Sequence, residues 1–235
     1  MPILTDDQKK NGYFNHIGGF PPLSDTDDRI NFAREVKDYG GQEKLCIACT
    51  QLDSYGYSER DKKRVLNEWL EFLSTETGTL KAIHFNSRVP QVLFDAACCQ
   101  ENLEELRIKW GPVSNLSALE KPKKLRFLYI GSGASVQDIS LLGKLSTLVV
   151  LYLKNFKRIE DYSALAKLEN LEQLIISGPT LALVKIKDLE FLREMPNLLS
   201  FWRPNTTIRK KYTQGELDAL CEALPNLTFV YDSGL

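Results

Sequence analysis

The chain has 235 residues, of which 43% are hydrophobic and 26% charged, with 30 Lys and Arg against 31 Asp and Glu. This composition is typical of a globular protein, and it excludes collagen-like, disordered and disulfide-scaffold chains. The net charge of -1 argues against binding of nucleic acid or anionic lipid through overall charge, and the two His exclude most His-based catalytic and metal sites.

Residues 1–23 contain Gly18-Gly19 and Pro21-Pro22, so we expect an irregular N-terminal lead there. The lead lacks the basic and apolar regions of a signal peptide, and no stretch of the chain approaches the roughly 18 apolar residues of a membrane span. The five Cys are odd in number, which fits reduced thiols better than a disulfide framework. We therefore expect a cytoplasmic protein that does not enter a membrane.

Residues 24–79 predict a helix, a strand and a second helix. A capping box at Ser24 begins a helix that carries Ile30, Ala33 and Val36 on one face. Residues 45–49 are apolar and predict a strand. A second capping box at Ser58 begins a helix over 58–74. The apolar residues of this second helix recur at helical spacing: Val65, Leu66, Trp69, Leu70 and Leu73.

From residue 80 onward a block of the form Leu-x-x-apolar-x-apolar recurs. Its leading residues are Leu80, Leu103, Leu125, Leu148 and Leu171, at steps of 22 or 23 residues, and looser copies follow at Leu198 and Leu227. The alternation predicts a short strand with one buried face, followed by a turn and a helical or 3-10 segment. One such coil cannot bury its own leucines, so we expect the coils to stack and share a core.

The end of the chain predicts a closing helix and a last strand. A capping box at Thr213 begins a helix that bears Leu217, Leu220, Cys221 and Leu224, and Pro225 ends it before a strand at residues 227–231. An open stack must shield its terminal leucines, so we interpret residues 24–79 as an N-terminal cap and residues 80–235 as the array with its C-terminal cap. Together they predict effectively one structural domain.

The repeat length and the segment Asp138-Ile139-Ser140-x-Leu142-x-x-Leu145 resemble the short class of leucine-rich repeat proteins, among them internalin-like and phosphatase-regulator-like arrays. This resemblance implies an α/β solenoid: a curved parallel sheet with short helices or 3-10 segments on the convex side, capped at both ends. The family usually has Asn eight residues after the leading Leu. Those positions hold other residues here, which predicts irregular turns: Arg88, Gly111, Gly133, Phe156, Pro179 and Thr206.

The third, fifth and seventh residues of each copy point away from the core, onto the concave face of such a solenoid. Because neighbouring strands lie roughly 4.8 Å apart, the aromatic residues at these positions predict one apolar stripe of the kind found at protein interfaces. The predicted partner-binding residues are Phe127, Tyr129, Val150, Tyr152, Ile175, Trp202, Phe229, Tyr231, Arg107 and Lys154. The alternatives are that cross-strand aromatic pairs only stabilise the sheet, or that a loop folds over them.

One pair of residues could support catalysis. If the strand at 45–49 stacks in register, Cys46 and His84 occupy the same outward position on adjacent strands, and a Cys–His pair can act as a nucleophile. Gly131-Ser132-Gly133 lacks the third Gly of a nucleotide-binding loop, and no metal-binding or other catalytic motif is complete. We therefore expect no enzymatic activity and no cofactor.

These patterns favour a non-enzymatic protein–protein interaction module that binds a protein partner on its concave aromatic face. The resemblance is compatible with an adaptor, inhibitor or immunity-type role. One alternative is an enzyme that uses the Cys46/His84 pair. The other is an RNA-binding repeat protein that uses the aromatic stripe together with a basic cluster, composed of Lys185, Lys187, Arg203, Arg209, Lys210 and Lys211.

Overall fold

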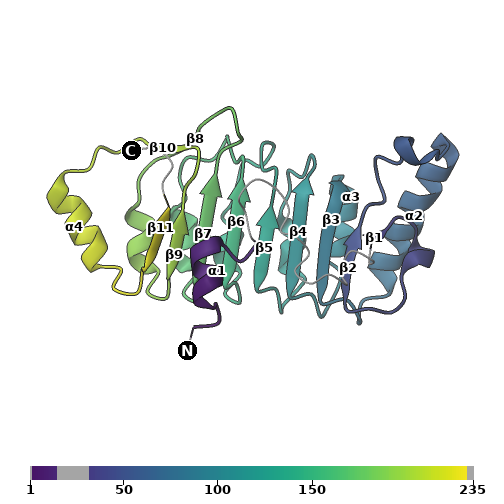
Figure 1. Ribbon diagram of the computed structural model, residues 1–235, viewed down its shortest axis with the longest axis horizontal. Coiled ribbons are helices and arrows are strands. Elements are labelled where there is room, and N and C mark those ends of the chain that lie inside the picture. Colours follow the sequence, from purple (N-terminus) through teal and green to yellow (C-terminus); the bar gives the residue numbers. More distant parts are fainter. Residues whose placement is uncertain (1, 15–31, 232–235) are drawn as a thin grey trace.

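The computed structural model describes residues 2–14 and 32–231 of the chain. Within them, a nine-stranded parallel sheet has the order β1-β2-β3-β4-β5-β6-β7-β9-β11 (Figure 1). The strands of this sheet are β1 (Phe32–Ala33), β2 (Lys44–Ile47), β3 (Ala82–Arg88), β4 (Glu105–Trp110), β5 (Phe127–Ile130), β6 (Val150–Lys154), β7 (Gln173–Ser177), β9 (Ser200–Trp202) and β11 (Phe229–Tyr231). A separate parallel pair joins β8 (Val184–Ile186) to β10 (Thr206–Ile208).

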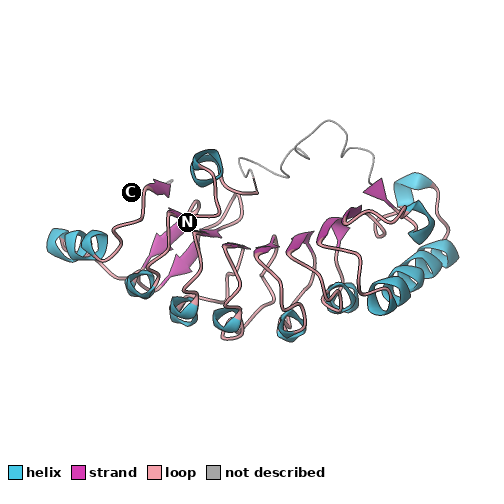
Figure 2. Cartoon of the chain, turned by 90° about the horizontal axis from the view of Figure 1, so that it is seen from below, coloured by secondary structure: helices cyan, strands magenta, loops and turns pink. Residues whose placement is uncertain are grey.

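Helices follow most strands and line one side of the sheet, with the exception of α1 (Asp6–Asn11), which lies on the opposite side (Figure 1 and Figure 2). The other α-helices are α2 (Glu59–Thr75), α3 (Gln91–Ala97) and α4 (Gln214–Glu222). The 3-10 helices are η2 (Val36–Asp38), η3 (Asp53–Tyr55), η4 (Ser117–Glu120), η5 (Leu142–Lys144), η6 (Ser163–Lys167) and η7 (Glu190–Glu194). This arrangement confirms the predicted leucine-rich repeat solenoid of stacked strand-turn-helix coils.

The core lies between the sheet and the helices on its convex side. All five regular leading leucines are completely buried, as is the fourth residue of each of these five copies, for example Leu128 and Leu151. The strands pair without a shift from β4 to β9, so that Leu106, Leu128, Leu151 and Leu174 lie side by side. Each coil therefore buries its leucines against the coils before and after it, as the repeat predicts.

Helix α2 closes the N-terminal end of the core. It begins at the predicted capping box, where the Ser58 hydroxyl accepts a hydrogen bond from the amide of Asp61, and it buries Val65, Trp69 and Leu73. Strand β2 extends the parallel sheet next to β3, which confirms the predicted strand with α2 as its crossover.

The helix predicted from Ser24 is wrong over the part of it that the structure describes. Residues 32–33 form β1, which pairs parallel to β2, and Val36 begins a single 3-10 turn. Pairing with the edge of the sheet satisfies backbone groups that a helix would have satisfied internally, for example where the amide of Ala48 donates to the carbonyl of Ala33 at 2.9 Å. Residues 24–31 lie outside the described residues.

Side chains bridge the turns that precede the strands. The Asn residue directly before a leading leucine donates a hydrogen bond from its side chain to a carbonyl of the preceding coil, at 2.6 to 2.9 Å: Asn102 to Gly78, Asn170 to Ser146, Asn197 to Glu169 and Asn226 to Pro196. Thr147 bonds in the same way to Leu125. The Asn residues that hold neighbouring coils together are therefore present, one residue before the leading leucine instead of eight after it.

The C-terminal cap contains the predicted helix, but Cys221 does not lie on its buried face. Helix α4 begins at the capping box of Thr213 and buries Leu220. Leu224 is also buried, whereas Cys221 is exposed. Arg193 joins α4 to the last coil by donating a hydrogen bond to the carbonyl of Ala219 at 2.9 Å.

Candidate functional site

The concave face is the side of the sheet that faces away from the convex helices, and strand register sets its side chains in rows. The fifth-position row runs Cys46, His84, Arg107, Tyr129, Tyr152, Ile175, Trp202 and Tyr231. Phe127, Val150 and Phe229 belong to the neighbouring third-position row. The predicted register of both rows is confirmed. The side chains of Phe229 and Tyr231 lie outside the described part of the chain.

The middle of this row forms a second hydrophobic cluster, separate from the core. Tyr129, Tyr152, Ile175 and Trp202 are only 6%, 5%, 1% and 7% exposed, although they point away from the core. The rings of Tyr129 and Tyr152 pack with their centroids 4.7 Å apart. Burial raises the pKa of both tyrosines above the ordinary value. Something other than the repeat core must therefore cover these side chains.

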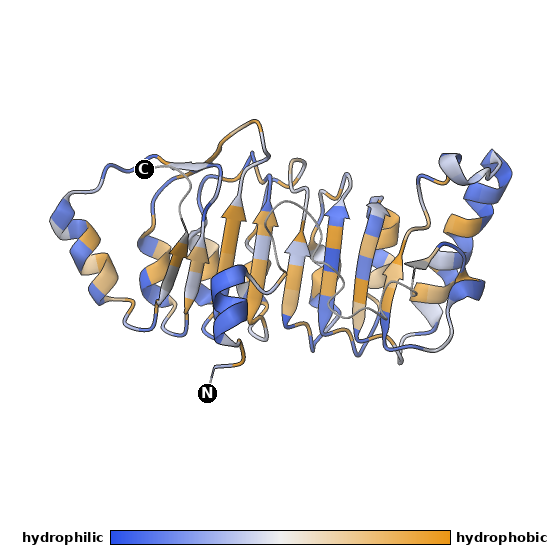
Figure 3. Ribbon diagram, viewed as in Figure 1, coloured by the Kyte–Doolittle hydropathy of each residue, from blue (hydrophilic) through white to orange (hydrophobic). Residues whose placement is uncertain are grey.

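Residues 2–14, which we call the N-terminal segment, cover them. Leu4 and Phe14 are buried in the second cluster, at either end of helix α1. Helix α1 begins at a capping box formed by Thr5 and Gln8, and it lies across the front of the sheet at β7 (Figure 1). It is hydrophilic, whereas the strands beneath it are largely hydrophobic (Figure 3). An irregular lead is predicted for residues 1–23, whereas residues 2–14 contain this helix and two apolar anchors.

Polar side chains of the sheet bind the backbone of the N-terminal segment. Glu172, directly before β7, accepts hydrogen bonds from the amides of Ile3 and Leu4 at 2.6 and 2.8 Å. Gln173 accepts one from the amide of Tyr13 at 2.7 Å and donates one to the carbonyl of Gln8 at 3.2 Å. Bonds from backbone amides to a carboxylate are stronger than those between neutral groups. The face therefore holds the segment through its main chain as well as through apolar contact.

Tyr13 attaches the end of the segment to β4 and β5. Its ring stacks on Phe127 at 4.2 Å between centroids and 6° between planes, and its hydroxyl donates to Glu105 at 2.9 Å. The other oxygen of Glu105 lies 2.6 Å from Nε2 of His84. Burial opposes ionisation of Glu105, but the bonds with His84 and Tyr13 outweigh it and leave the pKa of this carboxyl below its ordinary value. Burial and the nearby Glu105 raise the pKa of Tyr13.

Arg107 lies beneath the aromatic end of the segment. Its guanidinium is 5.7 Å from the ring centroid of Phe14 and 5.2 Å from that of Tyr129, within the range of cation–π attraction. Burial lowers the pKa of Arg107 to about 10. Lys154 is half-buried at the end of β6, in register with Ser177 and beyond the aromatic row. The part that the predicted residues play in binding a partner stays a prediction.

Cys46 and His84 are neighbours in register, as predicted. The thiol is buried, however, and burial raises the pKa of Cys46 to about 11, so that it is almost wholly protonated at neutral pH. His84 is engaged with Glu105. These surroundings oppose the thiolate that a nucleophile requires.

The two glycines of Gly131-Ser132-Gly133 have a packing role. A Cβ atom on Gly131 would lie 1.9 Å from the carbonyl oxygen of Lys109, and one on Gly133 would lie 2.2 Å from the ring of Phe156. The neighbouring coil and the buried ring thus leave room only for glycine at these two positions.

Three of the six residues of the basic cluster form ion pairs with acidic side chains. Arg209 lies 2.6 Å from Glu160, Lys187 lies 2.9 Å from Asp161, and Lys210 lies 2.8 Å from Glu190 and 3.1 Å from Glu216. Arg203 is buried. Such pairing reduces the charge that this rim presents to a phosphate backbone.

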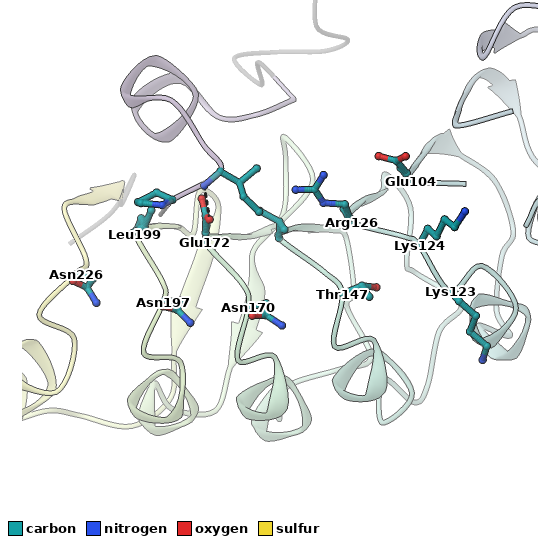
Figure 4. A pocket seen from close by; sticks show the side chains of 13 residues that line it. Glu104, Lys123, Lys124, Arg126, Thr147, Asn170, Glu172, Asn197, Leu199 and Asn226 are labelled. Atoms are coloured by element: carbon teal, nitrogen blue, oxygen red, sulfur yellow. Dashed lines mark hydrogen bonds between the residues drawn. The ribbon is translucent and has the colours of Figure 1, made fainter. Parts of the chain in front are cut away.

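A groove of about 830 Å³ lies where the strands begin, next to the N-terminal segment (Figure 4). Pro2 and Ile3 line it together with Glu172 and the turn residues Asn170, Asn197 and Asn226. Its other end carries Lys123, Lys124 and Arg126 beside Glu104. The groove therefore continues from the point where Glu172 binds the start of the segment.

Solved structures of leucine-rich repeat proteins resemble this chain. Internalin C2 from Listeria monocytogenes superposes with a TM-score of 0.52 at 22% identity, over 71% of this chain and 69% of that one. An internalin F from the same organism gives a TM-score of 0.42 at 15% identity, over 68% of this chain and 62% of that one. No family model and no curated protein matches the sequence. The likeness to internalin C2 shows that the chain has the leucine-rich repeat fold. Among the described residues, no helix is both long and apolar enough to cross a membrane.

Proposed function

We propose that this protein is an interaction module that binds a protein partner on the concave face of β4 to β9. The observation that carries the proposal is that this face already holds a polypeptide, the N-terminal segment, through an apolar cluster and through hydrogen bonds to its backbone. Leucine-rich repeat solenoids of the internalin type are protein-binding scaffolds, which agrees with this use of the fold.

The partner contacts that we propose are those of the aromatic stripe. Tyr152, Ile175 and Trp202 lie at its centre, where they supply rigid apolar area at a low cost in conformational entropy. Arg107 flanks the stripe on one side and Lys154 lies beyond it at the end of β6, while Phe229 and Tyr231 continue it along β11 by register. An adaptor, inhibitor or immunity-type protein would each use such a face. The five free thiols favour a reducing compartment, and we propose a cytoplasmic location on that ground.

Two observations weigh against the other functions. The raised pKa of Cys46 opposes catalysis by a Cys46/His84 pair. The ion pairs of Arg209, Lys187 and Lys210 oppose RNA binding through the basic rim.

Capture from a native lysate tests the proposal, with the wild type, Trp202→Ala and Leu181→Ala as baits. Leu181 is 98% exposed and lies off the concave face in the β7–β8 loop, so its variant is the matched control. We expect a protein that the wild type and Leu181→Ala retain and that Trp202→Ala loses. Retention of the same protein by folded Trp202→Ala would contradict the proposal. An RNA captured in its place would show steep loss with rising salt.

A further inference from the structure

The N-terminal segment contacts the concave face in the manner of a bound peptide ligand. Helix α1 itself has no buried residue, so the apolar contacts come from the flanking anchors Leu4 and Phe14, with Tyr13 stacked on the sheet. The segment reaches from Glu105 on β4 to Ser200 on β9. The order of the contacts along it is an apolar anchor, a polar helical turn and an aromatic pair.

The sheet in turn carries polar groups placed to bind a main chain. Glu172, Gln173 and Ser200 are buried polar side chains on the outward side, where the repeat core does not need them. Glu172 accepts from two consecutive amides, and the Ser200 hydroxyl donates to the carbonyl of Lys9 at 3.0 Å. Buried polar groups are unfavourable unless they are hydrogen-bonded, and all three of these side chains bond to the backbone of the segment that covers them.

The sheet holds the segment by hydrogen bonds to its backbone and by contacts with a few anchor side chains. Most of the other side chains of the segment take no part in this binding. The helix side chains of Asp6 and Lys9 bond to each other, at 2.8 Å, and not to the sheet. A segment of another protein with the same anchors could therefore make the same contacts. The groove beside Glu172 continues along the edge of the sheet, where a longer partner could extend.

We propose that the N-terminal segment is an internal occupant of the partner site, and that the partner binds through a segment of the same chemistry: an apolar anchor, a short polar helix and an aromatic pair. This inference rests on the proposed function. The partner segment displaces residues 2–14 and takes over their hydrogen bonds with Glu172, Gln173 and Ser200. A covalently attached occupant competes at an effective concentration on the order of millimolar for a short tether, so it weakens binding by every partner that needs this face.

A labelled peptide with the sequence of residues 2–14 tests this inference by fluorescence anisotropy against the full chain. In the double variant Leu4→Asp/Phe14→Asp the charged side chains cannot occupy the apolar cluster, so the face becomes available. We expect the peptide to bind this variant at least about 10-fold more tightly than the wild type. Leu181→Asp, a charge placed on the exposed β7–β8 loop, is the matched control and should bind the peptide as the wild type does. Adding Glu172→Ala to the double variant should weaken binding of the peptide at least about 10-fold, because the hydrogen bonds from two backbone amides lose their acceptor.

Failure of the peptide to bind a double variant that unfolds as cooperatively as the wild type would overturn the inference. If Leu4→Asp/Phe14→Asp does not fold, Leu4→Ala/Phe14→Ala supports the same comparison. Dimers of the wild type that exchange their N-terminal segments would also overturn it, because the occupant would then be a second copy of this chain. The proposed function fails separately, if Trp202→Ala leaves capture of the partner intact. If Trp202→Ala abolishes capture but the double variant captures no more partner than the wild type, only the inference fails.

Discussion

The two sides of the same sheet bury apolar side chains in different ways. On the convex side, the core joins leucines that recur every 22 or 23 residues, so each contact is with the next coil. On the concave side, the second cluster joins Leu4 and Phe14 to strands far along the chain, as the 191-residue separation of Lys9 and Ser200 illustrates. The core is built by the repeat itself, whereas the concave cluster needs a segment that does not belong to the repeat.

This difference predicts unequal stability on the two sides. The core cannot lose one coil without exposing its neighbours, but the N-terminal segment can leave while every strand pair stays intact. Regions held by few contacts open more readily than the global unit. The concave cluster is therefore the part of the molecule suited to exchange one polypeptide for another.

The largest expected effect is in the core. Leu151→Ala removes a completely buried side chain of β6, and we expect a loss of about 2–5 kcal/mol in the free energy of unfolding because a cavity is left behind. Urea denaturation followed by circular dichroism measures it. Leu181→Ala, at an exposed position, should change the same quantity by less than about 0.5 kcal/mol. Equal losses in the two variants would contradict the placement of the core.

A smaller effect is expected on the concave side. Phe14→Ala removes the buried aromatic anchor, but the loss cannot exceed the free energy with which the segment docks, so we expect about 1–3 kcal/mol. The same urea titration measures the loss. A loss as large as that of Leu151→Ala would show that the segment is part of the cooperative core, and the contrast between the two sides would be wrong.

The effect of pH on the unfolding free energy, through the Glu105 carboxylate that binds Tyr13, should be smaller than the loss in Phe14→Ala. The pKa of Glu105 lies below its ordinary value of 4.5 in the folded protein, so this carboxylate stabilises the fold above about pH 4.5 and the contribution is lost as the pH falls through the lower, folded-state pKa. We expect the difference in unfolding free energy between the wild type and Glu105→Gln to decrease as the pH falls from about 6 to about 3. A difference that grows in acid would contradict the assigned bonds with Tyr13 and His84.

The last prediction concerns the reactivity of a thiol and no change in stability. It is made for Cys46, at the other end of the concave row. Because its thiol is buried and its pKa is raised to about 11, iodoacetamide at neutral pH should modify it far more slowly than the exposed Cys221. Peptide mapping by mass spectrometry after timed alkylation measures both rates. Faster modification of Cys46 would favour the Cys46/His84 alternative.

The parts of the fold that the sequence predicts are those that depend on periodic or local patterns. The strand register follows from the repeat, and the capping boxes at Ser58 and Thr213 mark the cap helices, because each depends on residues close together in the chain. The Asn residues that bridge the turns also carry a local signal, since Asn102, Asn170, Asn197 and Asn226 each precede a leading leucine. This position differs from the family's usual one, eight residues after the leading leucine.

The occupant of the concave face could not be predicted in the same way. Thr5 and Gln8 form a capping box that is visible in the sequence, but a helix as short as α1 is not stable on its own in water. Its position depends on Glu172 and Gln173, about 160 residues away, and no periodic pattern connects them. The possibility that a segment folds over the aromatic stripe follows from sequence, but which segment does so does not.

Hydrogen exchange of the wild type, alone and saturated with its captured partner, tests most directly whether the concave face is the partner site. The amides of Ile3, Leu4 and Tyr13 bond to side chains of the sheet, so they should be protected in the free protein. We predict that partner binding removes this protection while the amides of β4 to β7 keep theirs. Protection of these three amides that is unchanged in the complex would show that the partner binds elsewhere.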